Sequence, residues 1–190
     1  MSSFDLAAAT QVTADVVFGV DDDQLSDRTP CPEYTVADLL DHVHGLSIAF
    51  AEAARKTAAG AAPSPDGSRL GPKWRDDIIA ALGDLAAAWR EPGAFEGVTM
   101  AGPVEMPGDA AALVALNEVV VHGWDLARAT AQTYDPDPGA VVLCREFVAS
   151  FEAPANDDGG LFGPPVDVEE DASDLHMLLG ATGRRPDWTP

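Results

Sequence analysis

The chain has 190 residues and a mass of 19.8 kDa, which suits one compact domain and leaves no room for a second large one. Its formal net charge of −21 at pH 7 opposes contact with phosphate backbones or anionic lipid, so neither nucleic acid nor membrane is expected as a partner. Apolar residues make up 46% of the chain, which argues against a disordered protein. We therefore expect a single globular domain over residues 1–190.

The cysteines and the amino-terminal sequence indicate the cellular compartment of the protein. Cys31 and Cys144 are far apart and form no CxxC pair, so neither a disulfide framework nor a cysteine zinc site is indicated. The amino terminus lacks the basic and apolar regions of a signal peptide, and no later segment has the unbroken apolar length of a membrane span. We expect a reduced, cytoplasmic setting, and the sequence leaves a homodimer open.

Apolar residues recur at helical spacing along most of the chain. Ser2 or Ser3 can cap the first predicted helix, and Thr35 with Asp38 resembles a capping box at the start of the second. The predicted helices cover about residues 4–20, 35–59, 72–90, 109–132, 139–151 and 174–181.

The connections are rich in turn-forming residues. Residues 60–71 are typical of a surface loop, residues 96–109 of a small hairpin or an irregular crossover, and residues 154–173 are too rich in Gly, Pro and acid for a long element. The helix at 109–132 is apolar on almost every side, which is typical of a helix surrounded by others. An all-α bundle of four or five helices is the simplest architecture.

Glu118 and His122 lie four residues apart in this central helix and project from one face. A rotation of about 100° per residue places Val114, Ala115 and Ala129 within roughly 60° of Glu118, so the face is apolar. A buried carboxylate costs several kcal/mol unless a cation or hydrogen bonds compensate it. Glu118 therefore requires a partner, and a metal ion would be one.

His42 is the third candidate ligand, because it faces inward on the second helix whereas His44 points nearly the opposite way. Side chains four apart on a helix stand about 5–6 Å from each other, so Glu118 and His122 can chelate one ion that His42 also binds. Two histidines and one carboxylate leave coordination positions open. Such a site suits Zn²⁺ or a similar ion that activates a bound water or thiol.

The same residues also have a simpler interpretation. A Glu and a His four apart on a helix often form a solvated pair, and a His among apolar residues is commonly a hydrogen-bonded core residue. Asp125 stands three residues after His122, and Asp38 stands four before His42. Each is either an indirect support for its histidine or a polar neighbour without a role.

Three stretches resemble one known family: TPCPEYTVADLLDHVHG, NEVVVHGWDLARAT and LLGATGRRPDW. They are similar to the actinobacterial DinB-like family related to the metal-binding domain of mycothiol-dependent maleylpyruvate isomerase. The resemblance covers nearly the whole chain and implies a DinB-like up-and-down four-helix bundle with small peripheral additions. It implies as metal ligands a His of the second helix and the Glu and His of the ExxxH string, which are His42, Glu118 and His122 here.

The resemblance also implies a function. Members are proposed to use a divalent metal, with Zn²⁺ the first candidate and Ni²⁺ or another ion open, to activate the low-molecular-weight thiol mycothiol for attack on an electrophilic substrate. We expect a mycothiol-dependent transferase or isomerase-like enzyme whose partners are a small-molecule thiol and an electrophile. The isomerase resembles a two-domain protein with an additional carboxy-terminal module, whereas this sequence ends at Pro190, soon after the predicted bundle. The isomerase reaction itself is therefore not expected. Two alternatives stay open: a hydrolase that uses metal-bound water, and a non-catalytic metal-binding stress-response module.

Other residues carry no assignment. Cys31 has only Arg28 as a basic neighbour in sequence, so a structural role is favoured for it. Large aromatics such as Trp124 and Trp188 mostly pack. Arg128 or Arg184 offers a bidentate fork to a substrate carboxylate, but a solvated surface role is commoner.

Overall fold

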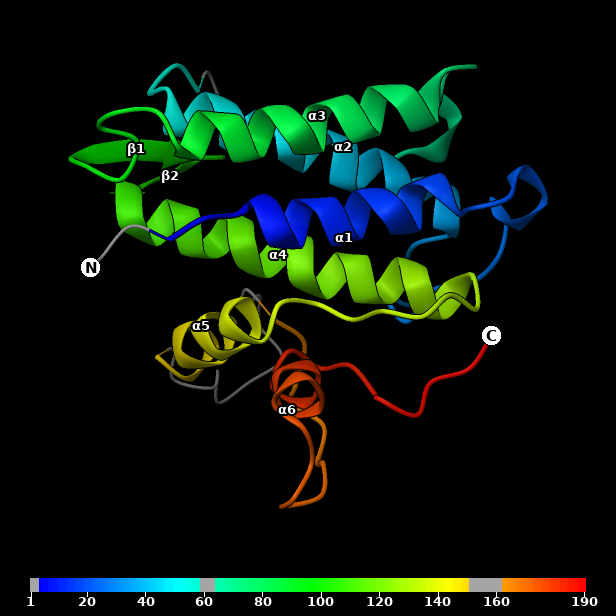
Figure 1. Cartoon of the computed structure of the whole chain (residues 1–190). Helices are drawn as coiled ribbons and strands as arrows, with labels where there is room; N and C mark the ends of the chain where they lie inside the picture. Colours follow the sequence, from blue (N-terminus) through cyan, green and yellow to red (C-terminus); the bar gives the residue numbers. More distant parts are fainter. Residues whose placement is uncertain (1–3, 59–63, 151–161) are drawn as a thin grey trace.

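The structure is a computed structural model that describes residues 4–58, 64–150 and 162–190. Four helices form a bundle, with a small hairpin at one end and two further helices against one side (Figure 1). The predicted all-α fold is confirmed. The elements are α1 (Ala7–Phe18), α2 (Val36–Ala54), α3 (Trp74–Trp89), β1 (Val98–Ala101), β2 (Val104–Pro107), α4 (Gly108–Ala129), α5 (Pro138–Ala149) and α6 (Asp174–Ala181), with 3₁₀ turns at Asp22–Gln24 and Gly67–Arg69.

The helices of the bundle run up, down, down and up (Figure 1). Two contacts show that α2 and α3 are parallel. Arg55, just after α2, forms a bidentate ion pair of 2.7 Å with Asp84 near the end of α3. Gly67, shortly before α3, donates its amide to Asp38 at the start of α2 (2.8 Å). The chain therefore returns along the length of α2 before α3 begins, so the helix directions do not alternate strictly.

Side-chain caps explain where several helices begin. At the start of α2, Thr35 Oγ1 accepts the amide of Asp38 (3.2 Å) and Asp38 Oδ2 accepts the amide of Thr35 (3.0 Å). This is the predicted capping box. Asp137 caps α5 ahead of Pro138 by accepting the amide of Ala140 (2.9 Å).

Two helices end earlier than the periodicity predicts. Lys56 has a φ of 60°, and the amide of Thr57 reaches back to the carbonyl of Glu52 (2.9 Å), which stops α2 at Ala54. Ala131 likewise has a φ of 55°, and α4 stops at Ala129. Both are Schellman ends without the glycine that usually marks them, so the sequence carries no local signal for either end.

The segment between α3 and α4 forms the predicted hairpin. Strands β1 and β2 are antiparallel, with Val98 opposite Pro107 and Ala101 opposite Val104. Thr99 Oγ1 donates to the carbonyl of Ala53 (2.6 Å), which attaches the hairpin to the end of α2. Strand β2 leads directly into α4. The hairpin, held by the contact with α2, therefore positions the first residues of α4.

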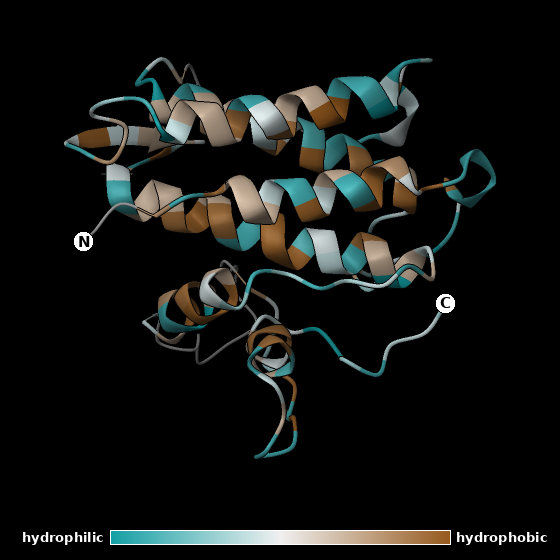
Figure 2. Ribbon diagram, in the orientation of Figure 1, coloured by the Kyte–Doolittle hydropathy of each residue, from teal (hydrophilic) through white to brown (hydrophobic). Residues whose placement is uncertain are grey.

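Helix α4 is the central helix, as predicted. It packs against α1 and α2 on one side and α5 on another (Figure 1), and most of its residues are buried. Hydrophobic residues recur along its ribbon (Figure 2). Contrary to the expectation from the sequence, its length and composition would also suit a membrane span, but 83% of the relevant window is buried inside the fold. An apolar helix of this kind is what the centre of a bundle requires.

Some predictions fall on residues outside the described ranges. These are a cap at Ser2 or Ser3, the predicted helix ends at Ala59 and Phe151, and the loops at 60–63 and 154–161. Within the described part, α1 begins at Ala7, whose amide donates to Asp5 Oδ1 (3.0 Å).

Candidate metal centre

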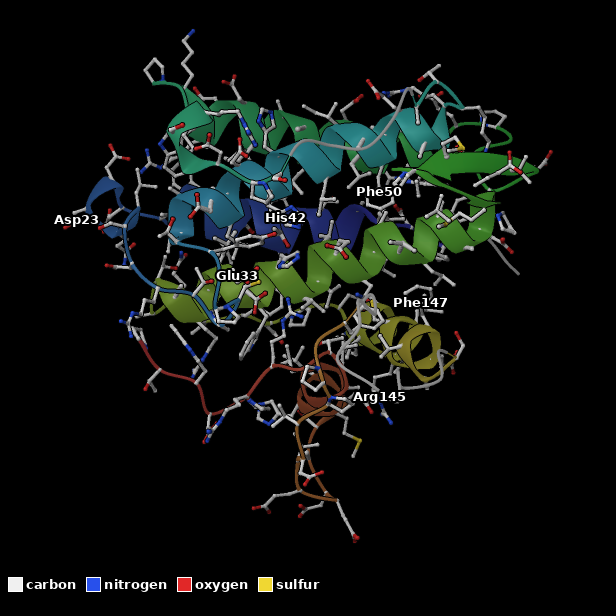
Figure 3. The ribbon with its side chains drawn as sticks, turned by 180° about the vertical axis from the view of Figure 1, so that it is seen from behind. Asp23, Glu33, His42, Phe50, Arg145 and Phe147 are labelled. Atoms are coloured by element: carbon white, nitrogen blue, oxygen red, sulfur yellow. The ribbon has the colours of Figure 1, made fainter. Side chains whose placement is uncertain are left out.

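Helices α2 and α4 bring the three predicted ligands together. His42 lies in the second turn of α2 and points toward α4 (Figure 3). Glu118 and His122 lie one turn apart on the face of α4 that meets it. One side-chain donor atom from each residue lies within 4.8 Å of the others. Residues far apart in sequence thus converge because their two helices pack side by side.

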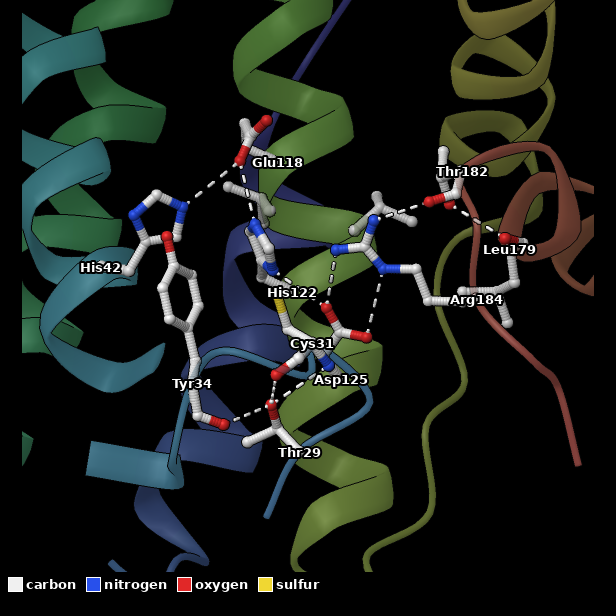
Figure 4. A network of polar contacts seen from close by, with 12 residues as sticks. Thr29, Cys31, Tyr34, His42, Glu118, His122, Asp125, Leu179, Thr182 and Arg184 are labelled. Atoms are coloured by element: carbon white, nitrogen blue, oxygen red, sulfur yellow. Dashed lines mark hydrogen bonds and ion pairs between the residues drawn. The ribbon is translucent and has the colours of Figure 1, made fainter. Parts of the chain in front are cut away.

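The imidazoles present their nitrogens to a single carboxylate oxygen (Figure 4). Glu118 Oε2 lies 3.1 Å from His122 Nε2 and 3.8 Å from His42 Nε2. The two rings stand nearly perpendicular, at 82°, with centroids 4.9 Å apart. His44 is not part of the cluster, in agreement with the helical rotation that separated it from His42.

The site is buried on one side and open on the other. The His122 side chain is only 8% exposed, whereas His42 and Glu118 keep 21% and 25% of their side-chain surface. Glu118 and His122 therefore do not form a solvated surface pair. Solvent still reaches the cluster on the side of His42 and Glu118.

Hydrogen bonds within the cluster shift the pKa values of Glu118 and His122. Burial acts to raise the pKa of Glu118, but hydrogen bonds with His122 and His42 outweigh it and bring the pKa well below its usual range. Burial acts to lower the pKa of His122, but hydrogen bonds to Asp125 and Glu118 outweigh it and raise the pKa to about 9. The negative charge that holds a proton on His122 so firmly would also hold a divalent cation.

Asp125 contacts His122 directly, where the sequence left either an indirect role for it or none. Asp125 Oδ2 lies 3.0 Å from His122 Nδ1, and the carboxylate is completely buried. Because a carboxylate only accepts hydrogen bonds, Nδ1 carries the hydrogen and a neutral His122 has its lone pair on Nε2, toward Glu118. A carboxylate behind a ligating histidine is the usual support of a metal site.

Asp38 does not support His42. Its carboxylate is engaged by Thr35 and by the amide of Gly67, which hold the pKa of Asp38 below its usual value against a smaller effect of burial. His42 is instead flanked by Tyr34, whose ring centroid lies 5.6 Å from that of the imidazole. Sequence reasoning missed Tyr34, and its place just before the capping box of α2 was the only signal for it.

Cys31 lies beside the cluster in space (Figure 4). Burial, and then the negative charge of Asp125, raise the pKa of its thiol to about 11. The side chain is therefore a neutral thiol at physiological pH, which makes it a poor nucleophile. This agrees with the structural role that the sequence favoured.

The two arginines considered for substrate binding have partners inside the protein. Arg128 donates to the backbone carbonyl of Trp188, which holds the carboxy-terminal segment on α4. Arg184 contacts Asp125, with Nη2 3.1 Å from Oδ2. Trp124 is buried and packs as expected, with the Arg128 guanidinium 6.0 Å from its ring centroid.

The donor set fits a divalent ion of the zinc type. Two imidazole nitrogens and one carboxylate oxygen are the ligands of many catalytic zinc sites, which keep a fourth position for water or substrate. The contact of His122 with Asp125 supplies the outer support that such sites need.

The family model of the mycothiol maleylpyruvate isomerase N-terminal domain matches residues 6–127. Two uncharacterized proteins of Mycobacterium tuberculosis, from two strains, are each 34% identical over 125 residues, which is 63% of this chain and 62% of theirs. The chain thus spans less than two thirds of the length of these relatives.

The fold is similar to crystal structures of the mycothiol-dependent maleylpyruvate isomerase and of a mutant of that enzyme in which one histidine is replaced by alanine. Both have a TM-score of 0.51, at 18% and 17% identity, over 76% of this chain and 65% of theirs. At this identity the similarity establishes the fold, and it is the all-α DinB-like fold that the sequence predicted.

Proposed function

This chain belongs to the family of the mycothiol maleylpyruvate isomerase N-terminal domain, and from that premise we propose that it binds a divalent metal ion through His42, Glu118 and His122 and activates a low-molecular-weight thiol there. The convergence of these three donors, with open surface on one side, carries the proposal. A divalent cation at this position would lower the pKa of a thiol that reaches it, so that thiolate exists at neutral pH.

The residues of the chain have separate parts in this proposal. Glu118 would offset the charge of the ion, and Asp125 would hold His122 with Nε2 free to bind it. The exposed edges of His42 and Glu118 leave an approach for the thiol and for a small electrophile. The thiol would lose its proton to solvent, and its sulfur would add to a carbon of an activated double bond; the π electrons of that bond would move to the neighbouring atom, which takes a proton from solvent.

The properties of the two cysteines support the proposal that the reactive thiol belongs to a bound molecule and not to the chain. Burial raises the pKa of Cys31 to about 11 and that of Cys144 to about 12, and in Cys31 the charge of Asp125 adds to the effect. Neither is a thiolate at neutral pH, so a sulfur nucleophile would have to be brought by a bound molecule. Mycothiol is the thiol we propose, since the similar solved structures are described as mycothiol-dependent.

Metal content and heat stability test the site. Purified protein should bind about one equivalent of Zn²⁺, and at about 100 times its Kd the free ion should stabilise the fold by about 2.7 kcal/mol. His122→Ala and Glu118→Gln should lose the bound metal and the metal-dependent rise in Tm. His44→Gln is the matched control, because His44 is on the same helix as His42 but outside the cluster. A folded wild type that takes up no divalent metal would reject the proposal.

The reaction is tested separately, on the metal-loaded protein. One panel of electrophiles is offered with mycothiol, with another small thiol, or with water alone, and the products are identified by mass spectrometry. Metal-dependent formation of the thiol adduct or its isomerised product supports thiol activation. Metal-dependent hydrolysis without thiol favours the hydrolase, and tight metal binding with no turnover favours a binding module.

A further inference from the structure

Arg184 reaches the metal centre from a part of the chain that the family model does not cover. It follows α6 in the carboxy-terminal segment, beyond the matched residues 6–127. Its guanidinium lies against Asp125 of α4, with Nη2 3.1 Å from Oδ2 and Nε 3.5 Å from Oδ1. The Arg184 side chain is 14% exposed and that of Asp125 is fully buried, so this is an internal ion pair (Figure 4).

The backbone after α6 directs Arg184 toward α4. The amide of Arg184 donates to the carbonyl of Leu179 (2.8 Å) and that of Gly183 to Gly180 (3.1 Å), which together form a Schellman end. Gly183 has a φ of +82°, and a Cβ there would lie 3.1 Å from Gly163. Glycine is therefore favoured at this turn for two reasons. Arg184 also donates Nη1 to the carbonyl of Thr182 (2.8 Å), which fixes the plane of the guanidinium.

Asp125 needs a cation that a metal-bound His122 does not provide. An imidazole that ligates a metal is neutral, so its Nδ1–H gives Asp125 a hydrogen bond but no compensating charge. Burying a carboxylate without a counter-charge costs free energy, so the side chain turns toward any other hydrogen-bond donor or cation within reach. Arg184 supplies that charge at Oδ2, the same oxygen that contacts His122.

We propose that Arg184 is a positioning residue of the metal centre: it compensates the charge of Asp125 and holds that carboxylate in place, and Asp125 in turn keeps His122 oriented with Nε2 toward the ion. The inference rests on the proposed function, because it requires His122 to be a metal ligand. It makes the carboxy-terminal segment part of the site. It also means that Arg184 is occupied by Asp125 and does not bind a substrate carboxylate.

The alternative is that the ion pair only docks the carboxy-terminal segment on the bundle. Arg128 separates the two roles, since it holds the same segment through the carbonyl of Trp188. Arg185 is a second control, because it pairs with Asp187 on the surface and its side chain is 68% exposed. Arg128→Gln loosens the segment, and Arg185→Gln removes one positive charge next to Arg184.

The experiment compares Arg184→Gln, Arg184→Lys and the two controls in the full chain. Zn²⁺ affinity is measured by competition with a chelating dye, and the visible absorption of the Co²⁺-loaded protein reports ligand geometry. Heat denaturation of the metal-free proteins gives the effect on the fold alone. We expect Arg184→Gln to weaken Zn²⁺ binding about 10–100-fold and to change the Co²⁺ spectrum. Arg184→Lys should restore part of the affinity, and both controls should bind as the wild type does.

The results distinguish this inference from the proposed function. If the wild type binds metal and Arg184→Gln binds it equally well, with an unchanged Co²⁺ spectrum, the inference is overturned. The proposed function then stays intact. An equal loss of affinity in Arg128→Gln and Arg184→Gln also overturns it, because docking of the segment then explains the effect. Wild type that binds no metal overturns both. If Arg184→Gln fails to fold, the affinity and spectrum of Arg184→Lys decide.

Discussion

Nδ1 of His122 lies 3.0 Å from Oδ2 of Asp125, one turn of the same helix away and on the opposite side of the ring from Glu118. The imidazole is therefore held between two carboxylates, one facing the open side of the site and one buried behind it. In the proposed function, Asp125 would affect the binding of a metal that it does not touch, because it determines which nitrogen carries the hydrogen.

The Asp125→Asn variant should weaken metal binding. An amide has nearly the same shape as the carboxylate, but it gives His122 a weaker acceptor and leaves Arg184 without its counter-charge. We expect Zn²⁺ affinity to fall about 10–100-fold, measured by competition with a chelating dye. Asp187→Asn, which removes an exposed carboxylate paired with an arginine, is the control. Equal affinity of Asp125→Asn and wild type would remove Asp125 from the site.

The capping box of α2 should make stability depend on pH. Hydrogen bonds from Thr35 and Gly67 lower the pKa of Asp38 in the folded protein. Since its folded pKa is below its unfolded value of about 3.9, Asp38 stabilises the fold fully above that pH. The contribution declines as the pH falls through the lower folded pKa. The Asp38 carboxylate thus stabilises the folded state at neutral pH but not in acid.

Asp38→Asn should accordingly reduce the free energy of unfolding by about 1 kcal/mol at pH 7. The difference from wild type should be the same at about pH 5 and should shrink below about pH 4, where the wild-type carboxyl becomes protonated. Urea denaturation at each pH measures it. Asp77→Asn, at an exposed position in the first turn of α3, is the control. A difference that stays constant into acid would show that the charge of Asp38 has no part in the cap.

Gly123 permits the close approach of α1 and α4. A Cβ at this position would lie 2.4 Å from Thr13 Oγ1 and 2.8 Å from the Tyr134 hydroxyl. Both hydroxyls donate to carbonyls of α4, Thr13 to Val119 (3.1 Å) and Tyr134 to Val120 (2.8 Å). An added methyl group must therefore displace two hydrogen-bonded side chains in the core.

Gly123→Ala should lower the free energy of unfolding by about 1–3 kcal/mol, as overpacked cores do. Gly83→Ala is a matched substitution inside α3, where a Cβ meets nothing within 4 Å. It should raise stability by about 0.5–1 kcal/mol, because alanine favours the helix. Urea denaturation of both variants checks the pair, and a Gly123→Ala protein as stable as Gly83→Ala would contradict the predicted overpacking.

The amino-acid sequence alone determined the features that depend on neighbouring residues. The period of the apolar pattern predicted the helices, and Thr35 and Asp38 predicted the capping box of α2. The four-residue spacing of Glu118 and His122 put both on one face of α4, and the apolar surroundings of that face showed that Glu118 needs a partner. These inferences succeed because a helix has a fixed rotation per residue, so local spacing translates directly into direction.

Tertiary structure alone decided what depends on residues far apart. The helix ends at Lys56 and Ala131 have no glycine, but side chains there contact other elements: Lys56 Nζ donates to the carbonyl of Ala94, and Gln132 Nε2 to that of Val16. The parallel run of α2 and α3 and the approach of Cys31 to the site likewise come from packing. The contact of Arg184 with Asp125 spans 59 residues and follows from how the end of α6 lies on α4. No local pattern encodes such distances, because they are fixed only when whole helices pack against one another.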